Sequence, residues 1–380
     1  MRNGLLASSL ALFAPVAPLA AQGDFLYSVS STDGLLRRVN PLTGAVLSSV
    51  QMVTNNNVNA QGCTGLSCDP ATGQLYAIMR EVSQPSVRKL ARVNPGNGAA
   101  TILGVLNDNF AALAFRPDGV LFAVTGDGAL VPETLYTLNP ANAQPTVVMP
   151  LGNGGPGESI AFGADGFLYH LSGCCTPNVD TVLERIDTAT NTVTVIPLSG
   201  FAYFEILSAT LLAGGNLLAA DLNDALLVIT TSGFATHVGQ FTYSAVKGLA
   251  FVPSAGTQPF FRPYGDGCTA ASGQIPLLLA SGVPTGGQNV QFDLVLAPPN
   301  SFGAFALGSG NTSVPFPSAA CQAQIVPADP NLMFFATTAT GTWTATFQVP
   351  PALVLDVYCQ VGVVDGPTLL VSNPVQAHVR

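Results

Sequence analysis

FLYSV, at residues 25–29, is the first of five similar stretches that return along the first two thirds of the chain. The others are QLYAI from Gln74, VLFAV from Val120, FLYHL from Phe167 and NLLAA from Asn216. The leucine in second place recurs at steps of 49, 46, 47 and 49 residues. A repeat of this length in strand-forming residues is typical of radial all-β architectures, in which each repeat forms one four-stranded sheet.

Each repeat divides into four strands, and the fourth repeat shows the division best. Residues 159–162 are its expected inner strand, and residues 167–171, 183–186 and 192–196 are the other three. Apolar and polar residues alternate along these segments, and Gly and Asp mark the turns between them, as half-buried strands require. The sequence therefore predicts a β-propeller with one blade per repeat.

The two ends of the repeat region complement each other. The first repeat has no inner strand before residue 25, whereas residues 248–252 are an inner strand with no blade after it. Pairing of residues 248–252 with residues 25–29 would complete the first blade and remove exposed sheet edges, a standing liability of all-β proteins. The prediction is a five-bladed β-propeller over residues 22–253.

The chain has an unusually low content of charged residues. They make up 9% of the 380 residues, against about 25% in an average soluble protein. Lys89 and Lys247 are the only lysines, and the formal net charge is −9. An acidic, lysine-poor surface repels phosphate groups, which excludes nucleic acid as a partner.

Residues 1–21 have the pattern of a secretory signal peptide. Arg2 supplies a positive start, residues 5–19 are apolar, and the small residues Ala20 and Ala21 offer a cleavage site. The apolar part contains prolines and is too short to span a bilayer comfortably, and no other stretch is apolar enough for a transmembrane helix. We expect a secreted or cell-envelope protein with no transmembrane segment after cleavage.

The repeat ends before the C-terminal third of the chain. Residues 254–263, rich in Pro and Gly, are expected to be a linker. Seven strand-like runs follow within residues 264–380, at residues 275–279, 290–296, 302–307, 332–337, 342–349, 354–364 and 368–372. Many short strands over about 115 residues predict an antiparallel β-sandwich.

Seven cysteines are present, and export would permit disulfides. Cys268 and Cys321 form the pair that the sequence supports best, since both lie at turn-like ends of strands. Cys63 and Cys68 are a second candidate pair that would close a small loop. The odd count leaves one thiol over, and the apolar surroundings of Cys359 indicate that it is the buried one. The pairing of the adjacent Cys174 and Cys175 stays open.

Propeller connectivity would bring the irregular loops to one face of the ring. The loops that enter inner strands carry Asp108, Asn109, Glu158, Glu205 and Lys247, with Glu158 and Glu205 on neighbouring blades. Carboxylates that converge at a channel mouth suit a calcium ion or an acid/base pair. The simpler alternative is that Lys247 forms an ion pair with Glu158 or Glu205.

Residues 24–253 resemble secreted bacterial propellers of the NHL and SMP-30 (gluconolactonase-like) kind. The resemblance lies in LAFRPDGVLFAV at residues 113–124, SIAFGADGFLYHL at residues 159–171 and DPATGQLYAI at residues 69–78. In gluconolactonase-like proteins a glutamate just ahead of an inner strand binds a metal, and Glu158 occupies a similar place. YGDGC at residues 264–268 and VSNPV at residues 371–375 resemble a C-terminal module found on many large secreted bacterial proteins.

Two functions follow from these features. The first is a secreted or envelope-associated binding module for an extracellular or envelope protein or glycan, with no cofactor. The absence of a Ser-His-Asp or HExxH arrangement in the sequence favours it. The second is a lactonase-like, metal-dependent hydrolase or lyase, with its site at the central channel mouth and Ca²⁺ as the ion that its oxygen ligands would suit.

Overall fold

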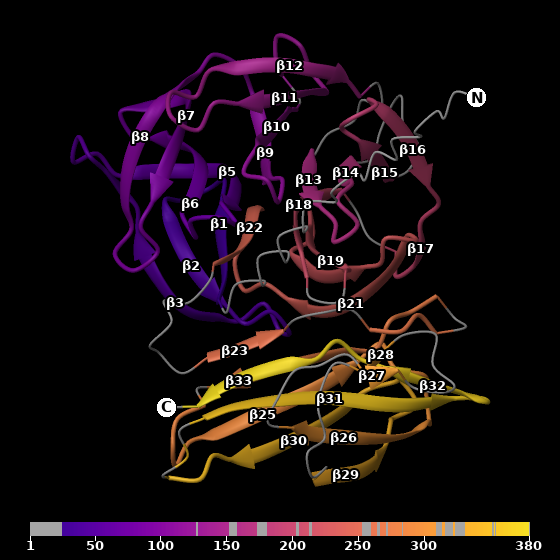
Figure 1. The fold of residues 1–380 in the computed structure, drawn as a ribbon. Coiled ribbons are helices and arrows are strands. Elements are labelled where there is room, and N and C mark those ends of the chain that lie inside the picture. Colours follow the sequence, from indigo (N-terminus) through magenta and orange to yellow (C-terminus); the bar gives the residue numbers. More distant parts are fainter. Residues whose placement is uncertain are drawn as a thin grey trace, which may run out of the picture.

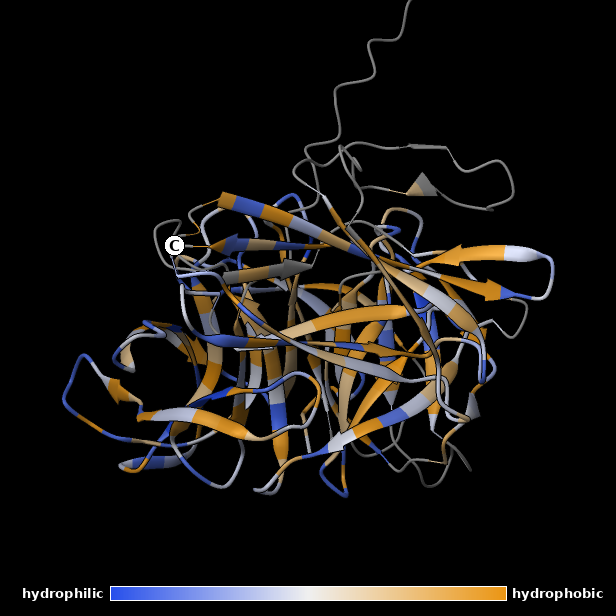
Figure 2. Ribbon diagram, turned by 90° about the horizontal axis from the view of Figure 1, so that it is seen from below, coloured by the Kyte–Doolittle hydropathy of each residue, from blue (hydrophilic) through white to orange (hydrophobic). Residues whose placement is uncertain are grey.

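The chain is built from β-strands, and the computed structural model contains no helix in the residues that it describes (Figure 1). These residues are 25–126, 128–151, 158–172, 181–202, 205–212, 215–252, 260–263, 267–270, 273–282, 284–308, 314–315, 322–323, 331–351, 353 and 355–379. The expected signal peptide lies outside them. Figure 2 shows hydrophobic stretches along many strands and hydrophilic ones at several turns.

Five antiparallel sheets of four principal strands each account for the repeat region. The first contains β22 (Val246–Val252), β1 (Phe25–Ser30), β2 (Leu35–Val39) and β3 (Val46–Gln51). The second contains β5 (Ala60–Cys68), β6 (Leu75–Glu81), β7 (Gln84–Val93) and β8 (Ala99–Leu106), with β4 (Val53–Thr54) parallel to β8. The third contains β9 (Phe110–Phe115), β10 (Leu121–Thr125), β11 (Thr134–Leu138) and β12 (Pro145–Pro150). The fourth contains β13 (Ser159–Phe162), β14 (Leu168–Ser172), β15 (Val182–Asp187) and β16 (Thr192–Ile196). The fifth contains β18 (Ile206–Leu211), β19 (Leu217–Asp221), β20 (Ala225–Ile229) and β21 (Phe234–Gln240), with β17 (Ser199–Gly200) parallel to β21.

The first sheet joins segments from the two ends of the repeat region. Strand β22 pairs antiparallel with β1, with Phe25 opposite Val252 and Val29 opposite Gly248. This confirms the predicted pairing of residues 248–252 with residues 25–29. The register shifts by one residue between Val29 and Ser30, where a β-bulge ends the regular ladder.

The first strands of the five sheets contact one another in a closed order: β22 with β5, β5 with β9, β9 with β13, β13 with β18, and β18 with β22. Small residues permit this close approach. A Cβ atom added at Gly65 would lie 3.2 Å from the Cα of Ala112. One added at Gly248 would lie 2.8 Å from the backbone nitrogen of Leu66. A side chain at either position would therefore press on the backbone of the neighbouring sheet.

The repeated turns close in the way that their residues dictate. In the turn after β2, the side chain of Asn40 accepts a hydrogen bond of 2.8 Å from the amide of Leu42, and Gly44 adopts a φ of 72°. Asn94 and Gly98 repeat this arrangement one repeat later, with a 2.8 Å bond from the amide of Gly96 and a φ of 73°. Asn stabilises the bend and Gly tolerates the left-handed conformation, so the pattern is a turn signal rather than a site.

Two further antiparallel sheets occupy the C-terminal third. One contains β23 (Phe260–Pro263), β33 (Val375–Val379), β31 (Leu355–Asp365), β26 (Phe302–Gly308) and β29 (Asn331–Ala336), with β32 (Thr368–Val371) paired to β31. The other contains β24 (Leu277–Gly282), β25 (Asn289–Val295) and β30 (Trp343–Gln348). A short pair, β27 (Val314–Pro315) and β28 (Gln322–Ala323), completes the region. Strand β23 falls within the segment expected to be a linker.

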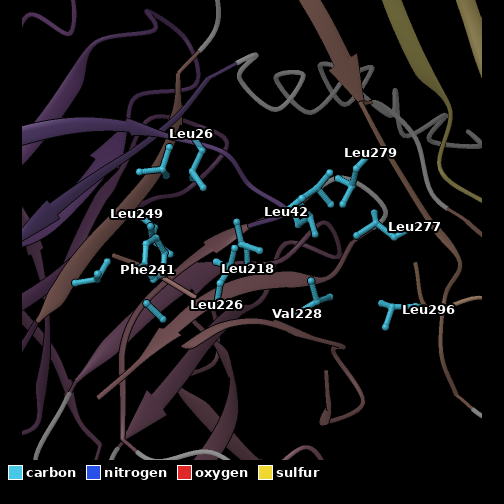
Figure 3. Close-up of a cluster of buried hydrophobic side chains, with 14 residues drawn as sticks. Leu26, Leu42, Leu218, Leu226, Val228, Phe241, Leu249, Leu277, Leu279 and Leu296 are labelled. Carbon is cyan, nitrogen blue, oxygen red and sulfur yellow. The ribbon is translucent and has the colours of Figure 1, made fainter. Parts of the chain in front are cut away.

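One apolar core joins the two C-terminal sheets. Phe292 of β25 lies against Phe305 of β26, with ring centroids 5.1 Å apart, and Val361 of β31 is fully buried in the same cluster. A second cluster links these sheets to the repeat region, because Leu277, Leu279 and Leu296 pack in one buried group with Leu42 and Val228 (Figure 3).

The cysteines differ from expectation at one pair. Cys63 and Cys68 are free thiols, so the predicted bond between them is wrong. Both belong to β5, where five residues of extended chain separate them by roughly 16 Å, far beyond the reach of a disulfide. Cys359 is free and buried, as expected. Cys268 is buried, but Cys321, Cys174 and Cys175 lie outside the described residues, so the bond from Cys268 to Cys321 stays a prediction.

The closing strand gives a test of this packing. Replacing Gly248 with Ala would place a methyl group 2.7 Å from Val29 Cγ2 and 2.8 Å from the Leu66 backbone. We expect G248A to lower the free energy of unfolding by about 1–3 kcal/mol, measured as a drop in melting temperature. G362A is the matched control, because its Cβ would make only an ordinary contact at 3.5 Å. Equal melting temperatures for the two variants would contradict the tight contact of β22 with β5.

Candidate functional site

A buried row of charged and polar side chains crosses the fourth sheet. Glu158 directly precedes β13, His170 lies in β14 and Glu184 lies in β15. The register places His170 opposite Ile160 and opposite Glu184, so neighbouring strands bring the groups together. All three side chains have no exposed surface.

The two carboxylates hold the histidine from both sides. His170 Nδ1 lies 2.9 Å from Glu184 Oε2, and His170 Nε2 is hydrogen-bonded to Glu158 Oε2. Ser172 donates a 3.3 Å hydrogen bond to the other oxygen of Glu158. Since both ring nitrogens face carboxylates, the arrangement suits a doubly protonated imidazolium, which donates from both nitrogens.

The surroundings of His170 move its pKa strongly. Burial, the largest single influence, lowers the pKa, but the charges and hydrogen bonds of Glu158 and Glu184 together outweigh it. The pKa rises from 6.5 to about 10. A histidine with this pKa is positively charged at neutral pH and is poorly suited to exchange protons with a substrate there.

Glu205, which directly precedes β18, and Lys247 of β22 form a second pair. The Lys247 Nζ lies 3.7 Å from Glu205 Oε1, and the side chains are 25% and 10% exposed. This confirms the simpler alternative for Lys247, an ion pair with a glutamate at the start of a first strand. Lys89, the other lysine, is hydrogen-bonded to Glu81 between β7 and β6, and both are buried.

Asp108 and Asn109 hold a neighbouring loop. Asp108 Oδ1 accepts hydrogen bonds from the amides of Leu130 at 2.7 Å and Asn109 at 2.8 Å. Asp108 Oδ2 accepts one from the amide of Val131 at 3.4 Å. The Asn109 carbonyl accepts a 3.0 Å bond from the amide of Gly126. Both carboxylate oxygens of Asp108 therefore accept hydrogen bonds from backbone amides.

Glu158 and the Asp108 loop are close neighbours. A Cβ atom added at Gly126 would lie 3.0 Å from the Cβ of Ala111 and 3.3 Å from the Cγ of Glu158. Glu158 therefore lies against Gly126, whose amide bonds to the carbonyl of Asn109, while its expected grouping with Asp108 and Asn109 themselves stays a prediction. The hydrogen bonds of Glu158 nevertheless run inward, to His170 and Ser172.

The sequence did not reveal His170 and Glu184 as partners of Glu158. His170 is fully buried in its strand. The usable signal is alternation: Leu168, His170 and Ser172 share one face of a strand that is buried on both faces. A charged residue on such a face needs a buried partner, which the register then identifies.

The described residues offer no ready metal site. Among them, no three His, Cys, Asp or Glu side chains are grouped so that they could hold an ion. The one compact group, Glu158 with His170 and Glu184, has both imidazole nitrogens occupied by carboxylates. A metal ion would therefore have to displace a hydrogen bond that the histidine already makes.

Comparisons with known proteins find likeness of structure alone. No protein-family profile matches the chain, and no curated protein matches it. A protein of unknown function from Bacteroides caccae is 12% identical and aligns over 62% of this chain and 100% of its own, with a TM-score of 0.40. A candidate 6-phosphogluconolactonase from Bacteroides uniformis is 12% identical and aligns over 60% of this chain and 71% of its own, with a TM-score of 0.35. These scores do not establish a family, and the NHL and SMP-30 resemblance stays a hypothesis.

The part of the chain that the structure describes contains no helix long and apolar enough to cross a bilayer.

The buried histidine gives a second test. We expect H170Q to lower stability by about 3–5 kcal/mol, because it leaves two buried carboxylates without their cation. H237Q is the control, since His237 is an exposed residue of β21. Adding E184Q to H170Q removes one uncompensated charge and should recover part of the loss. A melting temperature for H170Q equal to that of H237Q would contradict an ionic role for His170.

The raised pKa of His170 also fixes a pH dependence. The stabilisation is fully present below the unfolded pKa of about 6.5 and is lost as pH rises through the folded pKa of about 10. The melting temperature of the wild-type protein should therefore fall from pH 6.5 to pH 10 more steeply than that of H170Q. H237Q should keep the wild-type slope. Parallel curves for the wild type and H170Q would show that His170 titrates normally.

Proposed function

We propose that this chain is a secreted or envelope-associated binding module without catalytic activity. In this proposal the five sheets of the repeat region are the blades of a propeller, and the two C-terminal sheets form a β-sandwich. The pairing of β22 with β1 and the closed order of contacts among the first strands support the ring. The pattern of residues 1–21 supports export.

One observation carries the proposal: each acidic candidate is engaged by a partner inside the protein. Glu158 is hydrogen-bonded to His170, and Glu205 forms an ion pair with Lys247. Asp108 accepts hydrogen bonds from backbone amides. A general acid or base needs a carboxylate within hydrogen-bond reach of a substrate, and a calcium site needs six to eight oxygen ligands. Carboxylates that already neutralise buried groups fit the framework of a binding surface better than either.

The loop face around these residues is the proposed binding surface. Loops set on a rigid sheet scaffold are the usual place for recognition, and the internal pairs fix the loop ends. The proposed ligand is an extracellular or envelope protein or glycan, with no cofactor. The lactonase-like alternative would require Glu158 to leave His170, which would then keep only one of its two carboxylate partners, Glu184.

Catalysis is tested with two matched carboxylates. Purified protein is incubated with glucono-δ-lactone with and without Ca²⁺, beside E158Q and E184Q, which remove the two carboxylates that flank His170. We expect no hydrolysis above the background, and no rise in melting temperature with millimolar Ca²⁺, since saturating binding would add about 2.7 kcal/mol at a hundredfold excess over Kd. Turnover that E158Q abolishes and E184Q retains would replace this proposal with the lactonase-like one.

Binding is tested separately, by co-sedimentation of the purified protein with isolated cell-envelope material. Retention that protease treatment of the envelope removes would indicate a protein ligand, and retention that periodate removes would indicate a glycan. A protein that stays in the supernatant under all conditions would contradict an envelope-binding role.

A further inference from the structure

We propose that the C-terminal sheets contain a binding site for an uncharged hydrocarbon chain, such as the alkyl chain of a lipid or fatty alcohol. This proposal does not depend on the function of the repeat region. A cavity of about 540 Å³ lies between the two sheets. Side chains from both sheets line it, among them Phe261, Val290, Phe292, Phe347, Val357 and Val379.

The cavity lies at one end of the pair of sheets. Its walls come from the start of β25 and the end of β30 in one sheet, and from the start of β31 and the end of β33 in the other. Leu355, the first residue of β31, also lines it and is 40% exposed. Solvent therefore reaches the cavity beside Leu355, and a ligand can enter there.

Aromatic rings pack closely around Trp343 in another part of this core. Phe335 stacks on Trp343 with ring centroids 4.3 Å apart, and Phe305 lies 5.6 Å from the same tryptophan. Protein interiors are packed as closely as organic crystals, and voids larger than a water molecule are few. A volume of about 540 Å³ at the end of such a core is within the range of roughly 300 to 1,000 Å³ that small-molecule sites occupy.

The apolar side chains that line the cavity indicate which kind of ligand it would bind. No charged side chain occurs among the described residues that line the cavity, and Gln348 and the thiol of Cys359 are the polar contributions. Burying an unpaired charge is costly, so the part of a ligand that enters must be neutral. Transfer of a hydrocarbon chain from water onto such apolar walls is favourable, roughly in proportion to the area that it buries. In this proposal the chain lies in the cavity between the two sheets, and its polar head remains outside near Leu355.

Cys359 supplies an internal reporter. Its thiol is free, buried and part of the wall, and burial raises its pKa. Slow alkylation of Cys359 by N-ethylmaleimide, followed by mass spectrometry of the peptide, therefore measures access to the cavity. A bound chain should slow this reaction about tenfold once the site is nine-tenths occupied.

The experiment uses the whole chain with 1-octanol, 1-decanol and 1-dodecanol as probes. Calorimetry should show an affinity that rises about fourfold for each added methylene until the cavity is full. Saturating dodecanol should protect Cys359 from N-ethylmaleimide. An affinity that does not depend on chain length, or unchanged alkylation of Cys359, would overturn the proposal.

A filled-cavity variant adds a structural control. A377F places a phenyl ring on an inward-facing position of β33 that lines the cavity, and we expect it to reduce dodecanol affinity at least about tenfold. T346F introduces the same ring at an exposed position of β30 and should bind as the wild type does. Dodecanol affinity in A377F equal to that in T346F would contradict the assignment. If A377F does not fold, the protection of Cys359 in the wild-type chain decides.

The source of the chain is distinguished with phosphatidylcholine vesicles. Co-sedimentation that A377F weakens would support a lipid chain taken from a bilayer. Dodecanol binding without co-sedimentation would support a free amphiphile. Failure of both measurements would overturn the proposal and leave the envelope experiments on the repeat region unaffected.

Discussion

The antiparallel pairing of β22 with β1 is the contact on which the rest of the repeat region depends. It joins residues more than 200 positions apart in the chain and gives the first sheet its fourth strand. Without it β1 would present a free edge, and the contacts of β22 with β5 and β18 would be lost. Gly248 makes the pairing compatible with the neighbouring sheet, because any larger residue would meet Leu66. A contact of this sequence separation costs loop entropy, which the packing on both sides of β22 must offset.

The buried acidic groups of the repeat region form ion pairs and hydrogen bonds within and between its strands. All five glutamates of the chain are buried, and four of them are paired: Glu158 and Glu184 with His170, Glu205 with Lys247, and Glu81 with Lys89. In a chain with so few charged residues, most of its buried glutamates are engaged in pairs inside the repeat region. Buried ionic groups can specify one arrangement of strands even where they add little net stability. The group of Glu158, His170 and Glu184 fits that role, since its hydrogen bonds form only when the strands of the fourth sheet pair in one register.

Much of the fold could be predicted from the sequence, because a period near 47 residues repeats both the strands and their turns. The pairing of residues 248–252 with residues 25–29 followed from counting strands, and six of the seven C-terminal runs overlap observed strands closely. The site was harder. The ion pair of Lys247 with Glu205 was one of two pairings that the sequence suggested for Lys247. The contact of His170 with Glu184 depends on strand register, which local sequence does not specify. The bond from Cys63 to Cys68 failed because sequence proximity is no guide to distance within an extended strand.

The free cysteines of β5 have a consequence for the chemistry of the whole protein. Burial raises the pKa of Cys63 and of Cys68 to about 12, with only a partial opposing effect of Arg80 on Cys63. Thiol–disulfide exchange proceeds through the thiolate, and at neutral pH these sulfur atoms almost never carry that charge. An oxidising environment should therefore leave both of them reduced for long periods. Their raised pKa values should slow scrambling with any disulfide elsewhere in the chain, and the full burial of Cys63 adds a steric barrier that the half-buried Cys68 lacks.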